Sequence, residues 1–124
     1  MFRILIADGH AGFRQAAREL LREQFPRIEV GVASNGREAL RQLGGLDLLF
    51  LDISLSEENG LQGAAKIKFE HPHVAVSILT IHDAPEYRQA AFQHGADYFV
   101  SKGAPAEQIL EVVRSAIAST KARS

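Results

Sequence analysis

The stretch Leu48-Leu49-Phe50-Leu51-Asp52 places four consecutive apolar residues directly before a single carboxylate. An apolar run without alternation is typical of a strand that is buried on both faces of a parallel sheet. An ionised aspartate inside such a strand would be costly, but at the carboxyl end of the strand it can face solvent and a crevice. Open parallel sheets bind ligands at that edge, so Asp52 is the first candidate for a functional residue.

The composition is that of an ordinary single globular domain. The chain has 124 residues, of which 46% are hydrophobic and 23% charged, a net charge of −1, and no cysteine. The near-neutral charge gives no reason to expect direct contact with nucleic acid or an anionic membrane. The absence of cysteine excludes disulfides and thiol chemistry and fits a cytoplasmic location. No apolar run approaches the length of a signal peptide core or a membrane span.

Strand-like and helix-like segments alternate five times along the chain. The pattern predicts strands at 2–7, 28–33, 48–52, 74–80 and 98–101, and helices at 11–24, 37–43, 61–69, 85–94 and 105–118, with a frayed polar tail at 119–124. Strands that are joined by helix-length connections pair in parallel, and the helices cover both faces of the sheet. We therefore expect a doubly wound, flavodoxin-like (βα)5 fold, for which known examples give the strand order 2-1-3-4-5.

Polar residues follow the apolar runs at the expected ends of the strands. They are Asp8, Ser34, Asp52, Thr80 and Lys102. The carboxyl ends of parallel strands meet at one edge, and the order 2-1-3-4-5 brings strands one, three, four and five around one pocket. The sequence therefore predicts a notch that contains two carboxylates, one hydroxyl and one lysine.

Five short motifs, in this order and at this spacing, resemble the receiver domain of two-component response regulators, most closely the NarL/FixJ type. They are Ile-Leu-Ile-Ala-Asp at 4–8, Leu-Asp-Ile-Ser-Leu at 51–55, Asn-Gly-Leu at 59–61, Ile-Leu-Thr-Ile-His-Asp at 78–83 and Gly-Ala-Asp-Tyr-Phe-Val-Ser-Lys at 95–102. Each motif is weak alone. The resemblance implies that residues 1–124 form one receiver domain, with no DNA-binding output domain within them. Receivers of this type usually precede such a domain.

The resemblance also implies a role for each residue of the notch. Asp52 would be the phosphoacceptor that takes a phosphoryl group from a sensor histidine kinase or phosphotransfer protein. Lys102 would pair first with the acceptor carboxylate and then with a phosphoryl oxygen. Thr80 would be the switch hydroxyl, and the rotamer of Phe99 would follow it. The domain would then be the non-enzymatic, regulatory part of a transcriptional regulator. Its output face, where a partner or a second copy would bind, would comprise 85–94, 98–101 and 105–118.

The expected metal site departs from the family pattern. Mg²⁺ would be held by Asp8, Asp52 and the backbone carbonyl of Ser54, but Gly9 stands where a second acidic residue is usual. Loss of that carboxylate should weaken Mg²⁺ binding. Ser56 likewise replaces a usual proline. Two interpretations remain open: a working phosphoacceptor with a weakened metal site, or a degenerate receiver that acts as a phosphorylation-independent interaction module.

Simpler interpretations exist for several of these residues. Thr80 could be an ordinary strand residue, Lys102 a solvated surface lysine and Phe99 part of the sheet packing. The five histidines have no pair at helical metal-ligand spacing, so no zinc site is predicted. A flavodoxin-like cofactor binder would need a phosphate loop after the first strand, and a haloacid-dehalogenase phosphatase would need an aspartate where Ser54 stands.

Overall fold

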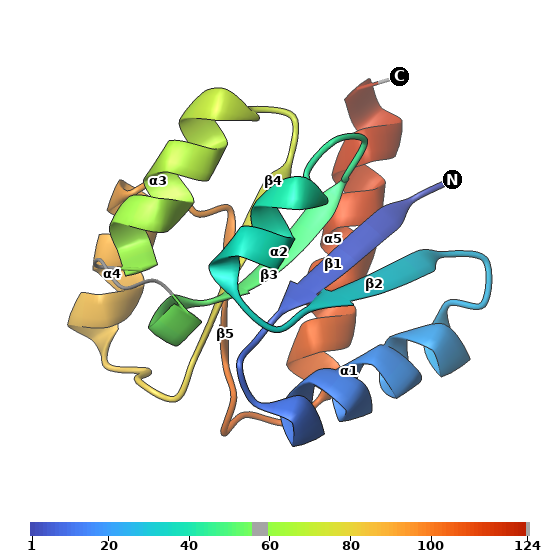
Figure 1. Cartoon of the computed structure of the whole chain (residues 1–124), viewed down its shortest axis with the longest axis horizontal. Coiled ribbons are helices and arrows are strands. Elements are labelled where there is room, and N and C mark those ends of the chain that lie inside the picture. Colours follow the sequence, from blue (N-terminus) through green and yellow to red (C-terminus); the bar gives the residue numbers. More distant parts are fainter. Residues whose placement is uncertain (56–59, 124) are drawn as a thin grey trace.

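Five parallel strands form one sheet, in the order β2-β1-β3-β4-β5, with helices on both faces (Figure 1). The structure is a computed structural model that describes residues 1–55 and 60–123. The strands are β1 (Arg3–Ala7), β2 (Glu29–Ala33), β3 (Leu48–Asp52), β4 (Ala75–Thr80) and β5 (Tyr98–Ser101). The helices are α1 (Ala11–Gln24), α2 (Gly36–Arg41), the 3-10 turn η1 (Ile53–Leu55), α3 (Gly60–Glu70), α4 (Pro85–Gln93) and α5 (Glu107–Arg123).

The central strand β3 is buried along its whole length. Its neighbours are β1 and β4, and both pairings are parallel. Side chains of a strand alternate between the two faces, and a strand covered on both faces must be apolar throughout, as Leu48 to Leu51 are. The predicted fold class and strand order are therefore confirmed.

Two hydrophobic clusters lie on opposite faces of the sheet. Ile4, Ile6 and Phe50 pack on one face with α1 and α5. Leu5 and Leu49 pack on the other face, together with α2, α3 and α4. Figure 1 shows the same two layers, with α1 and α5 on one side of the strands. The helices cover the two faces of the sheet, and the loops that follow the strands form its carboxyl edge.

The element boundaries agree with the predicted ones to within two residues, except at the end of the last helix. The prediction of a frayed tail from residue 119 is wrong, because α5 continues to Arg123. The hydroxyl of Thr120 donates to the Ala116 carbonyl at 3.0 Å within this last part of the helix. Pro105 precedes the helix, and its carbonyl accepts from the Gln108 N–H at 3.0 Å.

The predicted polar segment after β3, with Ser56, Glu57, Glu58 and Asn59, lies outside the described residues. Within the described ranges, no helix is both long and apolar enough to cross a membrane.

Gly60 begins α3 at a position that has no room for a side chain. A Cβ atom there would clash with the carbonyl oxygen of Ile53 and would lie 2.6 Å from its Cα atom. Both atoms belong to the backbone of the η1 turn that follows Asp52, so they cannot move aside as the end of a flexible side chain would. The glycine therefore allows α3 to pack against the turn that directly follows Asp52, the candidate acceptor.

We expect Gly60→Ala to lower the free energy of unfolding by about 1–3 kcal/mol, because the backbone of η1 must shift to accept the new methyl group. Gly12→Ala is the matched control, since a Cβ at that exposed position in α1 has nothing within 4 Å. It should be neutral or slightly stabilising. Urea denaturation of the three proteins measures both effects, and equal stability of the two variants would contradict the packing argument.

Candidate functional site

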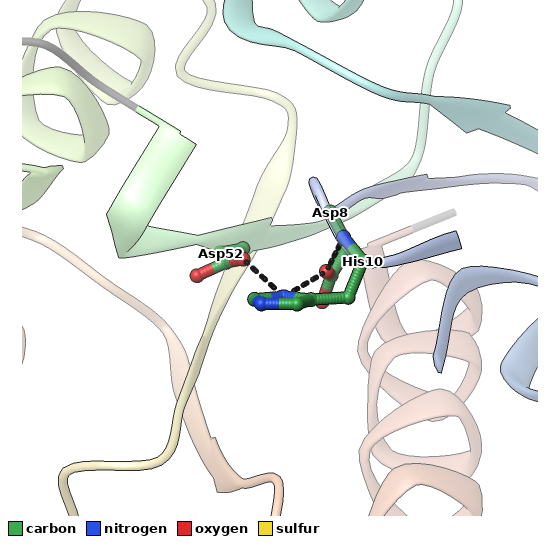
Figure 2. Close-up of side chains that lie close together, drawn as sticks. All are labelled: Asp8, His10 and Asp52. Carbon is green, nitrogen blue, oxygen red and sulfur yellow. Dashed lines mark hydrogen bonds and ion pairs between the residues drawn. The ribbon is translucent and has the colours of Figure 1, made fainter. Parts of the chain in front are cut away.

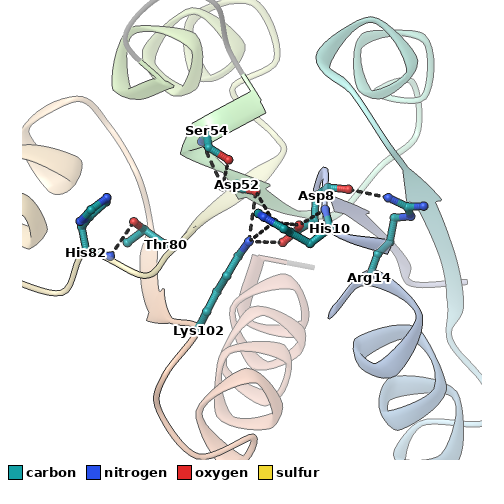
Figure 3. A network of polar contacts seen from close by, with 8 residues as sticks. All are labelled: Asp8, His10, Arg14, Asp52, Ser54, Thr80, His82 and Lys102. Carbon is teal, nitrogen blue, oxygen red and sulfur yellow. Dashed lines mark hydrogen bonds and ion pairs between the residues drawn. The ribbon is translucent and has the colours of Figure 1, made fainter. Parts of the chain in front are cut away.

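Asp52 ends β3, and its carboxylate is held in one orientation by the next turn. Its Oδ1 atom accepts from the Ser54 N–H at 3.0 Å and from the Ser54 hydroxyl at 2.8 Å. The other oxygen, Oδ2, is 3.1 Å from Nζ of Lys102 (Figure 3). The side chain is 3% exposed. Asp52 thus has one oxygen fixed by Ser54 and one oxygen turned toward a cation.

Lys102 follows β5, and its ammonium lies between two buried carboxylates. Nζ is 2.6 Å from Oδ2 of Asp8 and 3.1 Å from Oδ2 of Asp52. Nζ also lies 5.0 Å from the centroid of the Phe13 ring, within the range of a cation–π contact. The side chain is only 9% exposed. The interpretation of Lys102 as a solvated surface lysine is therefore wrong.

Asp8 follows β1 and is fully buried. Its backbone is fixed on two sides, because its N–H donates to the Ala33 carbonyl at 3.0 Å and its carbonyl accepts from Nη1 of Arg14 at 2.7 Å. Its Oδ1 atom accepts from the N–H of His10 at 2.7 Å. Among the described residues, its buried Oδ2 atom accepts no hydrogen bond, and the counter-charge of this oxygen is the Lys102 ammonium.

His10 joins the two carboxylates from the loop before α1. Its Nδ1 atom is 3.2 Å from Oδ1 of Asp8 and 3.8 Å from Oδ2 of Asp52 (Figure 2). One nitrogen or oxygen atom from each of these three residues lies within 4.8 Å of the others. The side chain of His10 is 73% exposed, so solvent reaches the cluster from this side.

The pKa of Asp52 lies below its usual value of 3.8. Burial alone raises this pKa, but the two hydrogen bonds from Ser54 and the ammonium of Lys102 together outweigh the cost of burial. The carboxylate is therefore ionised at neutral pH, which is the form that a nucleophilic oxygen requires.

A cleft of about 550 Å³ at the carboxyl edge of the sheet is lined by His10, Asp52, Ser54 and Lys102, among others. Thr80 also lines this cleft and is buried, and its Oγ1 atom accepts from the His82 N–H at 2.9 Å. The backbone of Thr80 is tied to that of Lys102, whose N–H donates to the Thr80 carbonyl at 2.8 Å. The cleft thus has a carboxylate, an ammonium and a hydroxyl along its walls.

Phe99 is buried in β5, where it lies opposite Ile78 of β4. Because Ile78 and Thr80 project to the same face of the sheet, Phe99 is a diagonal neighbour of Thr80 on that face. The guanidinium of Arg88, in α4, lies 5.0 Å from the centre of the Phe99 ring. Sheet packing therefore accounts for the position of Phe99. The register of β4 and β5 also places Phe99 beside Thr80, the candidate switch residue.

The structure brings together Asp8, Asp52, Thr80 and Lys102, as the strand-end argument predicts. Ser34 also follows a strand, but its hydroxyl donates to Glu38 of α2 at 3.1 Å, away from the cleft. The role of the Ser54 carbonyl stays a prediction, because the contacts of Ser54 to Asp52 are made by its N–H and its hydroxyl.

Two members of the cluster were missed by the sequence reasoning, which found no grouping among the histidines. His10 is two residues beyond Asp8 and belongs to the same loop. Arg14 lies one helical turn further, and its N–H donates to the His10 carbonyl at 2.9 Å at the start of α1. His10 and Arg14 could have been identified from their positions shortly after the end of the first strand, rather than from the spacing between histidines.

The donor set of the cluster fits a divalent cation. Two carboxylates and one imidazole converge, and the buried Oδ2 atom of Asp8 accepts no hydrogen bond from the described residues. Ordinary hydration does not reach that oxygen, because the side chain is fully buried, so it needs a positive charge nearby. Lys102 provides one such charge, and a metal ion is the other cation that this donor set suits.

Comparison with known proteins identifies the family. A family model described as the response regulator receiver domain matches residues 4–114. The chain belongs to this family, and the predicted resemblance is confirmed. It is a receiver, a signal-transduction domain of response regulators, which are regulatory proteins.

Individual relatives agree with this assignment. The chain is 31% identical over 116 residues to the glycerol metabolism activator of Pseudomonas putida and 34% identical over 116 residues to the oxygen regulatory protein NreC of Staphylococcus haemolyticus. Each match covers 91% of this chain but 52% and 54% of those proteins, so the chain spans about half their length. A CheY-like receiver from Methanospirillum hungatei shares the fold, with a TM-score of 0.85, 21% identity and coverage of 100% of this chain and 99% of that one.

We expect Lys102→Met to lower the free energy of unfolding at pH 7 by about 2–4 kcal/mol, because it leaves two buried carboxylates without their counter-charge. Asp52→Asn is the matched control, since it leaves Lys102 paired with Asp8 and should cost about 1 kcal/mol or less. Urea denaturation measures both. If Lys102→Met is as stable as the unchanged protein, the ammonium does not hold the carboxylates in place.

The lowered pKa of Asp52 also predicts an acid sensitivity. A carboxyl whose pKa is lower in the folded state stabilises that state when it is ionised. This contribution is fully present above the unfolded value, near 3.8, and is lost as the pH falls through the folded value. The free energy of unfolding should therefore fall more steeply between about pH 5 and pH 2 in the unchanged protein than in Asp52→Asn. Equal slopes in denaturant titrations would contradict this assignment.

Proposed function

We propose that the chain accepts a phosphoryl group on Asp52 from the phosphohistidine of a sensor histidine kinase or a phosphotransfer protein. The observation that carries the proposal is the Lys102 ammonium, which lies within 3.1 Å of carboxylate oxygens on both Asp8 and Asp52 at the edge of an open cleft. Phosphoryl transfer depends mainly on positioning and on neutralising charge, and this arrangement supplies both.

The transfer itself is a simple displacement. Oδ2 of Asp52 forms a bond to phosphorus while the P–N bond of the donor breaks, and the donor imidazole keeps the electron pair of that bond. Ser54 holds the other carboxylate oxygen by two hydrogen bonds, so Oδ2, which faces the Lys102 ammonium, is the oxygen that would react. The Lys102 ammonium then moves from the carboxylate to a phosphoryl oxygen, which keeps the positive charge beside the developing negative charge.

A divalent cation such as Mg²⁺, when bound, would neutralise negative charge between the acceptor carboxylate and the phosphoryl oxygens. Asp8 and Asp52 would hold it, together with the backbone carbonyl of Ser54. Asp8 supports its part in such a site because it is fully buried and its Oδ2 atom, which accepts no hydrogen bond from the described residues, needs a positive charge nearby.

The response to phosphorylation is proposed to begin at Thr80. Its hydroxyl now accepts from the His82 N–H, and it would turn to donate to a phosphoryl oxygen. Phe99, its diagonal neighbour, would then change rotamer beneath Arg88, which is 5.0 Å from its ring. The surface formed by α4, β5 and α5 would carry this change to a partner or to a second copy of the chain.

We further propose that the domain is the regulatory part of a transcriptional regulator in the cytoplasm. The support is the sequence similarity to an activator and to a regulatory protein, each about twice as long as this chain. The lack of cysteine is in keeping with a reducing compartment.

The alternative is a degenerate receiver that binds partners without phosphorylation. Gly9, which supplies no side-chain ligand, is the observation that favours it. The intact set of Asp8, Asp52, Thr80 and Lys102 favours the phosphoacceptor, because a domain that only binds partners has no need of a paired cation inside its cleft.

Incubation with a small phosphodonor such as acetyl phosphate and a divalent metal tests the proposal. Intact mass spectrometry should show the mass of one added phosphoryl group, and Asp52→Asn should show none. Lys102→Met should slow the reaction by about 100-fold, because charge stabilisation is lost. Asp47→Asn is the matched control: it makes the same change next to the amino end of β3, where Asp47 accepts from the Arg3 N–H at 2.8 Å.

Phosphoryl incorporation into Asp52→Asn would contradict the assignment of the acceptor. A folded protein that gains no phosphoryl group with either Mg²⁺ or Mn²⁺ present, yet still binds its partner, would establish the alternative.

A further inference from the structure

We propose that the cation site of this chain is a mixed nitrogen–oxygen site, in which Nδ1 of His10 is a ligand beside Asp8 and Asp52. Such a site takes a first-row transition-metal ion such as Mn²⁺ in preference to Mg²⁺. This inference rests on the proposed function only because it concerns the same cleft. It can be tested independently, since metal binding is measurable without any phosphoryl transfer.

The distances between the donor atoms suit a shared ion. Ligands that lie about 2.0–2.2 Å from one metal are roughly 3 Å apart when they subtend a right angle. Nδ1 of His10 is 3.2 Å from Oδ1 of Asp8 and 3.8 Å from Oδ2 of Asp52. The exposed ring of His10 can rotate to close the longer of these distances, since its side chain is 73% exposed.

The meeting point of these residues already holds a positive charge. Nζ of Lys102 is 2.6 Å from Asp8, 3.1 Å from Asp52 and 3.4 Å from Nδ1 of His10 (Figure 3). The same three residues therefore surround one cation, and a divalent ion would have to displace the ammonium to enter. Lys102 and the metal ion compete for one position in the unphosphorylated protein.

The chemistry of the ligands determines which ion can compete. Mg²⁺ prefers carboxylate, carbonyl and water oxygens, whereas imidazole nitrogen suits Zn²⁺, Fe²⁺ and Ni²⁺ best. Mn²⁺ shares the preference of Mg²⁺ for oxygen but, as a transition-metal ion, accepts an imidazole ligand more readily than Mg²⁺ does. Gly9 provides no carboxylate, so His10 is the third side chain that completes the cluster in the described part of the chain. Replacement of an oxygen ligand by nitrogen weakens Mg²⁺ binding more than Mn²⁺ binding.

His10 can be changed without loss of a helix cap. It is the N-cap residue of α1, but its side chain makes no capping hydrogen bond. Its backbone N–H, which donates to Asp8, is kept in an alanine variant. His10→Ala therefore removes the imidazole and leaves the local fold in place. His73→Ala is the matched control, because it removes an exposed imidazole shortly before β4, at the opposite edge of the sheet.

Calorimetric titration with MnCl₂ and with MgCl₂ tests the inference on the three proteins. His10→Ala should weaken Mn²⁺ binding by about tenfold or more and Mg²⁺ binding by much less. His73→Ala should change neither. Electron spin echo spectroscopy of bound Mn²⁺ should show coupling to a nitrogen nucleus that disappears in His10→Ala. Equal effects of His10→Ala on both metals, or Mn²⁺ without nitrogen coupling, would overturn the proposal.

Gly9→Asp provides the converse test. The backbone of Gly9 does not adopt a positive φ, so a side chain at this position requires no strained backbone conformation. The added carboxylate should tighten Mg²⁺ binding more than Mn²⁺ binding and make His10 less important. The two proposals can fail independently. If Mn²⁺ is bound through nitrogen but Asp52 is not phosphorylated, only the proposed function is contradicted. If Asp52 is phosphorylated but metal binding does not depend on His10, only this inference is contradicted.

Discussion

The ammonium of Lys102, held between the carboxylates of Asp8 and Asp52, is the interaction on which the site depends. Two buried carboxylates so close together would repel each other in a medium of low dielectric constant. One lysine stabilises both, at 2.6 and 3.1 Å. The surrounding residues maintain this arrangement: Ser54 fixes the carboxylate of Asp52 and Arg14 holds the backbone of Asp8.

Much of the site could be predicted because its members are tied to strand ends. A parallel sheet brings the residues that follow β1, β3, β4 and β5 to one edge, whatever their separation in the sequence. Asp8, Asp52, Thr80 and Lys102 were found in this way. His10 and Arg14 were not, because their positions depend on the path of the loop into α1. The apolar pattern likewise could not reveal that α5 continues to Arg123, since residues 119–123 carry no apolar stripe.

Gly9 gives this receiver an unusual balance of charge. With one carboxylate fewer than the family pattern, the cluster carries less negative charge, and the single ammonium of Lys102 neutralises a larger share of it. The exposed imidazole of His10 lies beside Asp8 in this cluster, and we propose that it is the third metal ligand. If both proposals hold, Lys102 links the choice of metal ion to phosphoryl transfer at Asp52, because its ammonium contacts both carboxylates.

The most direct test of this account is a crystal structure of the protein grown with beryllium fluoride, a mimic of the phosphoryl group, and Mn²⁺. In that structure we expect beryllium to be bonded to a carboxylate oxygen of Asp52, with Nζ of Lys102 moved to a fluoride and the metal ion beside Asp8. Beryllium fluoride bound elsewhere, or a Lys102 ammonium that remains between Asp8 and Asp52 while Asp52 is occupied, would contradict it.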